Sequence, residues 1–189
     1  MIKINNLTKK YKDKLAVDNL NLEIKTGELF SLLGTNGAGK TTTIKMLSTL
    51  ILPTSGEVEI NNLDLVKDSS KIKEIINISP QETAVASNLT VLENLYFMAG
   101  IYQIPNKENK IKELIKLFKL EEVLKQKAKT LSGGYQRKLS IAISLINNPK
   151  ILFLDEPTLG LDVISRHDLW KVIEALKGKT TIILTTHYM

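Results

Sequence analysis

With 189 residues, the chain is long enough for one domain with a substantial core, and its 43% hydrophobic and 24% charged residues are typical of a globular protein. The absence of cysteine excludes disulfides and thiolate metal sites, no opening segment resembles a signal peptide, and no apolar run approaches the roughly 18 residues that cross a bilayer. The net charge of +6 comes from lysines mixed with acidic residues, which favours solvated helix faces, above all at residues 107–129, over a nucleic-acid-binding patch.

The first third of the chain is predicted to contain strands around one glycine-rich turn and one helix. Apolar and polar residues alternate at residues 2–4 and 20–24, which indicates half-buried strands. Residues 29–33 form a compact apolar run that ends at Gly34, as a buried strand would. A helix is predicted from Thr41 until the break at Pro53, and strand pattern returns at residues 58–60.

The rest of the chain alternates between helical and strand patterns. Residues 83–147 are mainly helical in pattern, and residues 151–154 and 180–186 are predicted to be buried strands. Between these strands, Ser165 is expected to cap a helix, with Asp168 three residues further on in a capping-box pattern. The alternation predicts an α/β core with a parallel sheet, into which the helical segment is inserted.

A phosphate-binding loop is predicted after the strand at residues 29–33, because residues 34–41 match the pattern G-x-x-x-x-G-K-[ST]. Glycines let successive backbone N–H groups point at phosphate oxygens, and the helix that follows adds its positive N-terminus. The alternative, a glycine-rich turn that caps a structural helix, is disfavoured by the strand before the loop and the helix after it. The residues predicted to contact the nucleotide here are Gly34, Thr35, Asn36, Gly37, Ala38, Gly39, Lys40, Thr41 and Thr42.

Two acidic residues follow the strand at residues 151–154. Asp155 is predicted to hold magnesium together with the hydroxyl of Thr41, and Glu156 to polarise the attacking water. Taken alone, such acids often only mark the surface end of a strand. The phosphate-binding loop in the same chain favours the catalytic interpretation.

Five further features occur in an order that resembles the ABC ATPase family. The most specific is Leu131-Ser132-Gly133-Gly134-Tyr135-Gln136, which is similar to the family's signature L-S-G-G-x-Q. Ser132 can cap a helix whose free N–H groups face an anion. For the four residues alone, an ordinary capped helix start would be a reasonable alternative. The position of the motif, between the phosphate-binding loop and the acidic strand, favours the signature.

The other features are weaker individually, since a single Gln, His or Tyr is more often structural. Gln81 resembles the glutamine that touches magnesium or water and senses the membrane partner, and residues 159–162, which end in Asp162, resemble the D-loop. His187 matches the switch histidine at the γ-phosphate, and Tyr11 the aromatic residue that stacks on adenine. The resemblance therefore implies Glu156, His187 and Gln81 as catalytic residues and Thr41, Gln81 and Asp155 as magnesium ligands. It also implies that Ser132, Gly133, Gly134, Gln136 and Asp162 contact nucleotide.

The resemblance further implies how the chain works. It predicts a P-loop NTPase core with a parallel sheet (residues 1–82 and 148–189), an N-terminal antiparallel β subdomain and an inserted helical subdomain (about residues 83–147), all in one domain. In the family, ATP and Mg2+ lie in a head-to-tail dimer, between the phosphate-binding loop of one subunit and the signature of the other. Closure on ATP drives an integral membrane permease subunit, which docks between Gln81 and Leu131. The location implied is the cytoplasmic face of the cell membrane, and no nucleic-acid partner is expected.

Residues 88–95 and 186–189 resemble the daunorubicin-resistance branch of exporters in particular, which favours export through a separate permease. The chain ends two residues after His187, whereas the family's domain continues with further strands and helices. We therefore expect a C-terminally truncated fragment that hydrolyses ATP poorly.

Two other function classes stay open at this point. Non-transport ABC ATPases act on DNA or ribosomes. The repair members carry a very long insertion between the phosphate-binding loop and the signature, whereas Lys40 and Leu131 are only 91 positions apart here. The ribosomal members usually hold two ATPase halves in one chain, and this chain holds one. A generic P-loop kinase or GTPase would lack the motif at residues 131–136.

Overall fold

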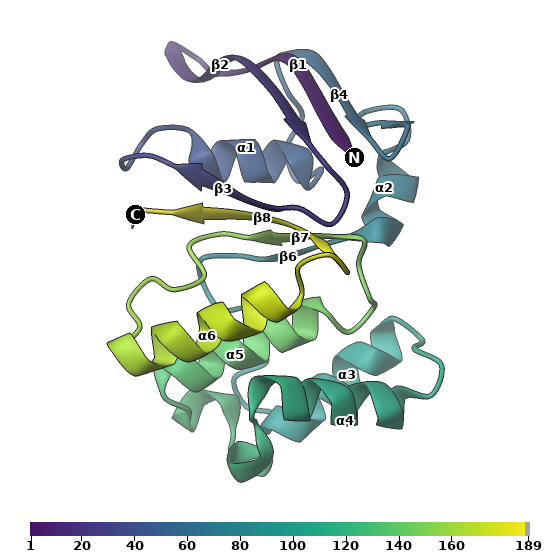
Figure 1. The fold of residues 1–189 in the computed structure, drawn as a ribbon, viewed down its shortest axis with the longest axis vertical. Coiled ribbons are helices and arrows are strands. Elements are labelled where there is room, and N and C mark those ends of the chain that lie inside the picture. Colours follow the sequence, from purple (N-terminus) through teal and green to yellow (C-terminus); the bar gives the residue numbers. More distant parts are fainter. Residues whose placement is uncertain (188–189) are drawn as a thin grey trace.

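The computed structural model describes residues 1–187, which form two four-stranded sheets with helices between and below them (Figure 1). Tyr188 and Met189, which contribute to the predicted branch resemblance, lie outside the described residues. The elements are, in chain order, β1 (Ile2–Tyr11), β2 (Lys14–Ile24), β3 (Leu29–Leu33), α1 (Lys40–Leu47), β4 (Ser55–Ile60), β5 (Leu63–Asp64), α2 (Ser69–Ile75), β6 (Ile76–Ser79), α3 (Val91–Ile101), α4 (Lys107–Phe118), η1 (Glu121–Val123), η2 (Ala128–Thr130), α5 (Gly133–Ser144), β7 (Ile151–Leu154), α6 (Val163–Ala175) and β8 (Thr181–Thr186).

The N-terminal sheet is antiparallel, with the strand order β2-β1-β4-β5. Ile2 at the start of β1 pairs with Ile24 on one side and with Ile60 on the other, and all three side chains are fully buried. Alternation along these strands places their apolar side chains against α1, which lies between the two sheets (Figure 1). The antiparallel β subdomain predicted from the sequence is therefore confirmed.

The second sheet is parallel, with the strand order β3-β8-β7-β6. Every residue of β7 and β8 is buried, as continuous apolar runs in a sheet covered on both faces should be. Successive residues of β7 point to opposite faces, so Phe153 packs toward α1 while Leu152 and Leu154 pack toward the helices below. The parallel α/β core is confirmed, and its strands all end at the same edge.

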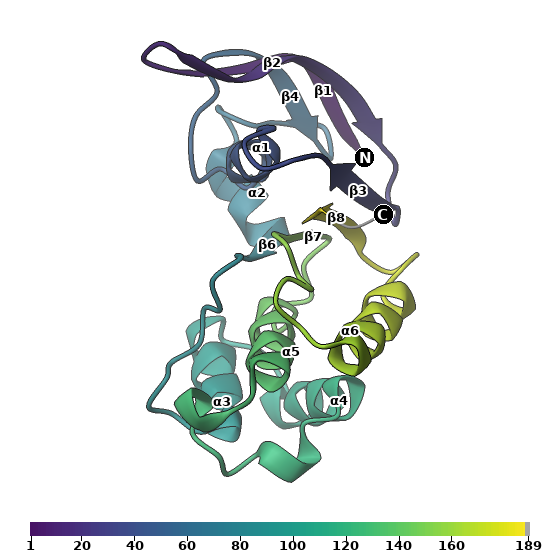
Figure 2. The same ribbon diagram turned by 90° about the vertical axis from the view of Figure 1, so that its left-hand side faces the viewer.

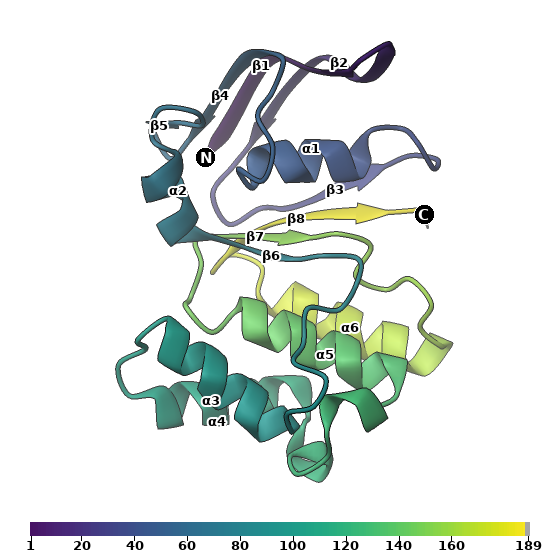
Figure 3. The ribbon, with the colours of Figure 1, turned by 180° about the vertical axis from the view of Figure 1, so that it is seen from behind.

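Helices α5 and α6 cover the lower face of the parallel sheet, and α3 and α4 lie further out beneath them (Figures 2 and 3). Leu139 on α5, Leu169 on α6 and Phe118 on α4 are all fully buried in one apolar cluster with the sheet. The helical pattern of residues 83–147 is thus confirmed, although its division from the core as a subdomain stays a prediction. Among the described residues, no helix is both long and apolar enough to cross a membrane.

Two features differ from the sequence prediction. Helix α6 begins at Val163 rather than after Ser165, so the prediction of Ser165 as its cap is wrong. The cap is Asp162, whose carboxylate accepts hydrogen bonds from the N–H groups of Ile164 at 3.0 Å and Ser165 at 2.9 Å. In addition, β5, α2 and β6 were not predicted from the sequence. In β6, Asn77 interrupts an otherwise apolar run, and its side chain bonds to Asn147, 70 residues away.

Candidate functional site

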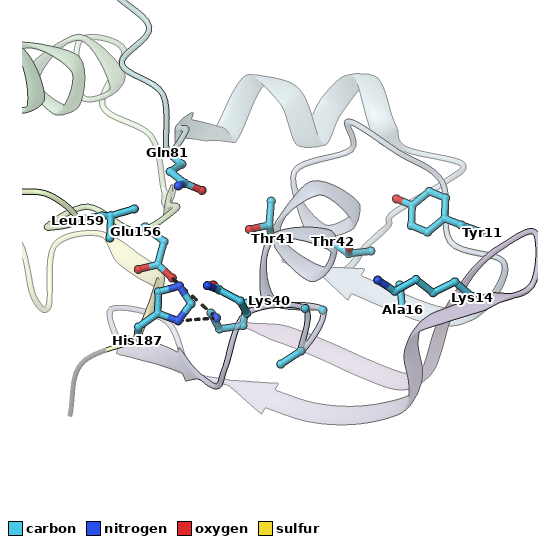
Figure 4. Close-up of a pocket in the computed structure, with 14 residues that line it drawn as sticks. Tyr11, Lys14, Ala16, Lys40, Thr41, Thr42, Gln81, Glu156, Leu159 and His187 are labelled. Carbon is cyan, nitrogen blue, oxygen red and sulfur yellow. Dashed lines mark hydrogen bonds and ion pairs between the residues drawn. The ribbon is translucent and has the colours of Figure 1, made fainter.

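A pocket of about 350 Å³ opens where the parallel sheet ends beside the start of α1 (Figure 4). It brings together many residues that were predicted from the sequence, from five separate parts of the chain. The residues that line it are Tyr11, Lys14, Ala16, Asn36, Gly37, Ala38, Gly39, Lys40, Thr41, Thr42, Gln81, Glu156, Leu159 and His187. Gly34 and Thr35 accept hydrogen bonds from the Lys40 side chain through their carbonyl oxygens.

The loop between β3 and α1 needs glycine at two positions. Gly37 and Gly39 have φ angles of 84° and 85°, in the left-handed region that other residues rarely adopt. A Cβ on Gly39 would also overlap the carbonyl oxygen of Ala16 in the neighbouring hairpin. Because the N-cap residue of α1 is this glycine, the first N–H groups of α1 receive no side-chain cap and point toward the pocket. Such a helix start is suited to an anion.

Lys40, Glu156 and His187 meet at the inner end of the pocket (Figure 4). The ammonium group of Lys40 donates hydrogen bonds to the carbonyl oxygens of Gly34, at 2.7 Å, and Thr35, at 3.1 Å. It also lies 3.8 Å from Glu156 Oε1 and 3.2 Å from His187 Nδ1. His187 Nε2 is 2.9 Å from the same Glu156 oxygen, without the alignment of a hydrogen bond.

Glu156 is held in an unusual place for a carboxylate. It is 4% exposed, and its φ angle of 49° lies in the left-handed region. Its backbone N–H donates to Thr185 Oγ1 at 2.8 Å, which fixes the turn after β7 to the end of β8. A buried carboxylate held by strand ends and facing a cationic pocket is a good position for a group that orients water.

Two hard oxygen ligands lie together beside this cluster. Thr41 Oγ1 donates to Asp155 Oδ1 at 3.1 Å, and Thr185 Oγ1 donates to the same oxygen at 2.6 Å. Magnesium binds proteins through one or two carboxylates and completes its shell with substrate phosphates and water, so Thr41 and Asp155 fit it. Gln81 lines the same pocket, whereas its magnesium contact stays a prediction.

Tyr11 lies at the outer end of the pocket, where β1 ends. Its ring is 45% exposed, and Lys9 Nζ lies 5.1 Å from the ring centroid. An exposed ring at this place can stack on a base. Lys14 from β2 lines the same end, and the sequence analysis did not select it (Figure 4).

The signature residues do not line this pocket. Ser132 is the N-cap of α5 and its hydroxyl accepts a hydrogen bond from the Tyr135 N–H at 3.4 Å, while Gln136 Nε2 donates to the Leu131 carbonyl oxygen at 3.2 Å. Gly134 lies so close to α6 that an added Cβ would be 2.7 Å from Ser165 Oγ. None of the residues predicted to contact nucleotide in this part of the chain lines the pocket, and their contacts stay predictions: Ser132, Gly133, Gly134, Gln136 and Asp162.

The sequence analysis missed two residues next to the site. Thr185 fixes both Asp155 and Glu156, and its only signal in the sequence is its place at a strand end. Arg137, the residue after the signature, is 5% exposed and donates hydrogen bonds to the carbonyl oxygens of Pro80, at 2.7 Å, and Gln81. Burial lowers the pKa of Arg137, and the nearby charge of Asp155 opposes this shift.

Comparison with known proteins gives consistent matches. The family model described as ABC transporter matches residues 17–159, a range that excludes Tyr11, Asp162 and His187. The phospholipid-transporting ATPase ABCA3 of Homo sapiens is 42% identical over 194 residues, which cover 100% of this chain and 11% of that protein. The probable multidrug ABC transporter ATP-binding protein YbhF of Escherichia coli (strain K12) is 38% identical over 192 residues, which cover 100% of this chain and 33% of that protein. The chain thus spans a third or less of these two relatives.

Solved structures match over the whole fold. The dimeric ATP-binding cassette MJ0796, in a post-hydrolysis state bound to ADP and Pi, has a TM-score of 0.87 and 32% sequence identity, covering 100% of this chain and 88% of that one. The cbiO1 protein of Clostridium perfringens, part of the complex cbiONQ, has a TM-score of 0.88 and 30% identity, covering 99% of this chain and 78% of that one.

Proposed function

We propose a function from one premise: the chain belongs to the ABC transporter family, as an ATP-binding domain. The proposal is that it binds ATP with Mg2+, hydrolyses ATP to ADP and phosphate, and so powers transport. The observation that carries it is the meeting of Lys40, Glu156 and His187 beside the Thr41–Asp155 pair, at the end of a glycine-rich loop.

Each group has a distinct task in the proposed reaction. The phosphates of ATP lie against the N–H groups of residues 36–42, and Lys40 turns its ammonium group from the carbonyl oxygens of Gly34 and Thr35 to the phosphate oxygens. Thr41 and Asp155 would hold magnesium, which would neutralise part of the phosphate charge. Tyr11 stacks on adenine, at the other end of the pocket.

The chemical step is attack by water on the γ-phosphorus, which breaks the bond from that phosphorus to the bridging oxygen of ADP. Glu156 accepts a hydrogen bond from the water, which aligns the water oxygen for attack, and takes up the proton that the water loses as the bond to phosphorus forms. His187, which contacts Glu156 through Nε2, turns to the γ-phosphate when ATP binds. Gln81 lines the same pocket and would contact magnesium or the water.

The proposed active state is a head-to-tail dimer. Ser132, Gly133 and Gly134 lie outside the pocket of their own chain, and this supports a site completed by the signature of a second copy. The related cassette MJ0796 is dimeric with ADP and Pi, which supports the same arrangement here. In that arrangement, the start of α5 faces the γ-phosphate of the other subunit.

The transport part of the proposal rests on the relatives. The names of ABCA3 and YbhF refer to phospholipid transport and multidrug transport. We propose export through a separate integral membrane permease at the cytoplasmic face of the cell membrane, with the daunorubicin-resistance type as the branch. The segment between Gln81 and Leu131, which holds α3 and α4, is the proposed docking region.

Single-turnover hydrolysis with protein in excess over labelled ATP tests the chemistry, because it detects slow reactions. The wild-type chain should convert ATP to ADP and phosphate. Glu156→Gln should bind ATP as before but hydrolyse it about 100-fold or more slowly. Equal rates for both proteins would show that Glu156 does not activate the water. The absence of any hydrolysis by the wild type would contradict the proposed ATPase activity.

Purification of the intact protein from its source tests the transport part. A copurifying protein with several membrane spans is expected. Ribosomes or DNA in its place would favour the non-transport class of ABC ATPases.

A further inference from the structure

A buried cation connects the signature helix to the segment that carries Gln81. Arg137 lies in the second turn of α5. Its Nη1 donates a hydrogen bond to the Pro80 carbonyl oxygen at 2.7 Å, and its Nη2 donates one to the Gln81 carbonyl oxygen. The planar guanidinium group thus spans two successive carbonyl groups of the chain just after β6. Two parallel donors in a fixed plane are a geometry that lysine does not offer.

Burial of this cation costs free energy that its partners must offset. Arg137 is 5% exposed, and taking a guanidinium group out of water is unfavourable without partners. Its partners are the two carbonyl oxygens and the negative charge of Asp155, which itself is 5% exposed and bonded to Thr41. A residue that only packed α5 onto the sheet would need neither a charge nor two donors.

Two further uncharged polar contacts join β6 to α5 and to the turn that follows α5. Ser140 Oγ lies 3.1 Å from Ser79 Oγ, with both residues almost fully buried, and Asn77 Nδ2 donates to Asn147 Oδ1 at 3.1 Å. These contacts follow β6 from its start to its end, and Arg137 continues them to the edge of the pocket. Helix α5 and the Gln81 segment are therefore tied at successive points.

We propose that Arg137 is a positioning residue for the magnesium–ATP site, acting through the backbone of Gln81. Its two hydrogen bonds fix the turn at residues 80–81 so that the Gln81 side chain lies in the pocket. The inference rests on the proposed function. It deepens that function, because a shift of α5, which carries Ser132 at its start, moves Gln81 with it. The signature is in this way coupled to the magnesium ligands of its own chain.

The test compares Arg137→Lys, which keeps the charge but cannot span both carbonyl groups, with Ser140→Ala, which removes an uncharged contact between the same two elements. Calorimetry gives the ATP affinity in magnesium and in EDTA. For Arg137→Lys, we expect the gain in affinity from magnesium to fall about tenfold, the worth of one charged hydrogen bond, with the affinity in EDTA unchanged within about twofold. Amide exchange at residues 80–88 without nucleotide should also be faster. Ser140→Ala should match the wild type in the magnesium gain.

The inference would be overturned by an unchanged magnesium gain in Arg137→Lys, or by affinities in magnesium and EDTA that fall together, since a purely structural role gives those results. If Arg137→Lys shows no cooperative melting, Arg137→Gln, which keeps one amide donor, is judged by the same criteria. Adding Arg137→Lys to Gln81→Ala should cause no further loss of the magnesium gain, and an additive loss would show that Arg137 acts independently of Gln81. A wild-type chain without any magnesium gain would instead contradict the proposed function.

Discussion

Replacement of Lys40 by alanine removes the ammonium group at the centre of the pocket. This group donates hydrogen bonds to two neutral carbonyl oxygens at 2.7 Å and 3.1 Å. Phosphate oxygens are stronger acceptors, because they are charged. A hydrogen bond to a charged partner is worth about 1.5–3 kcal/mol, so the loss should raise the Kd for magnesium–ATP about 10- to 150-fold.

The assay is calorimetric titration with magnesium–ATP, with Lys45→Ala as the matched control. Lys45 lies in the last turn of the same helix, is exposed, and carries the same charge. The control should bind ATP as the wild type does, which separates the local contact from the change in net charge. A Kd for Lys40→Ala within about twofold of the wild type, in a protein that melts normally, would refute the assignment of Lys40 to the phosphates.

Three further predictions follow from the structure. Gly39→Ala should lower the free energy of unfolding in urea by about 1–3 kcal/mol and weaken ATP binding, because alanine is strained at this φ angle and its Cβ meets Ala16; wild-type stability would contradict this. Asp162→Ala should lower the melting temperature at pH 7. Hydrogen bonds from Ser165 lower the pKa of Asp162, so the carboxylate stabilises the fold above its unfolded pKa, and the difference should shrink as pH falls through the lowered value; a difference independent of pH would argue against the carboxylate. Ser132→Arg should leave the ATP affinity of the monomer within about twofold, because Ser132 does not line the pocket, and a loss as large as that of Lys40→Ala would place the signature in its own chain's site.

The parts of the site that are continuous in the sequence could be predicted. The residues around Lys40 share one turn whose chemistry depends on local spacing, and Asp155 follows an apolar run that is typical of a buried strand. Parallel strands end at the same edge of a sheet, so the contact between Thr41 and Asp155, 114 residues apart, follows from the fold class.

Other features depend on contacts that spacing does not reveal. The start of α6 could not be decided from its pattern, since Asp162 and Ser165 are both good caps, and the close approach of α6 to Gly134 is a matter of tertiary packing. Arg137 looks like an ordinary helix residue in the sequence. Its burial becomes visible only when the turn after β6 is placed against α5.

In the proposed dimer, each ATP site combines the pocket of one copy with the signature of the other. The most direct measurement is the mass of Glu156→Gln by light scattering, because this variant should bind ATP without consuming it. The account predicts a monomer without nucleotide or with ADP, and a dimer with magnesium–ATP. A protein that binds ATP but remains monomeric at saturation, or that is dimeric whatever the nucleotide, would contradict it.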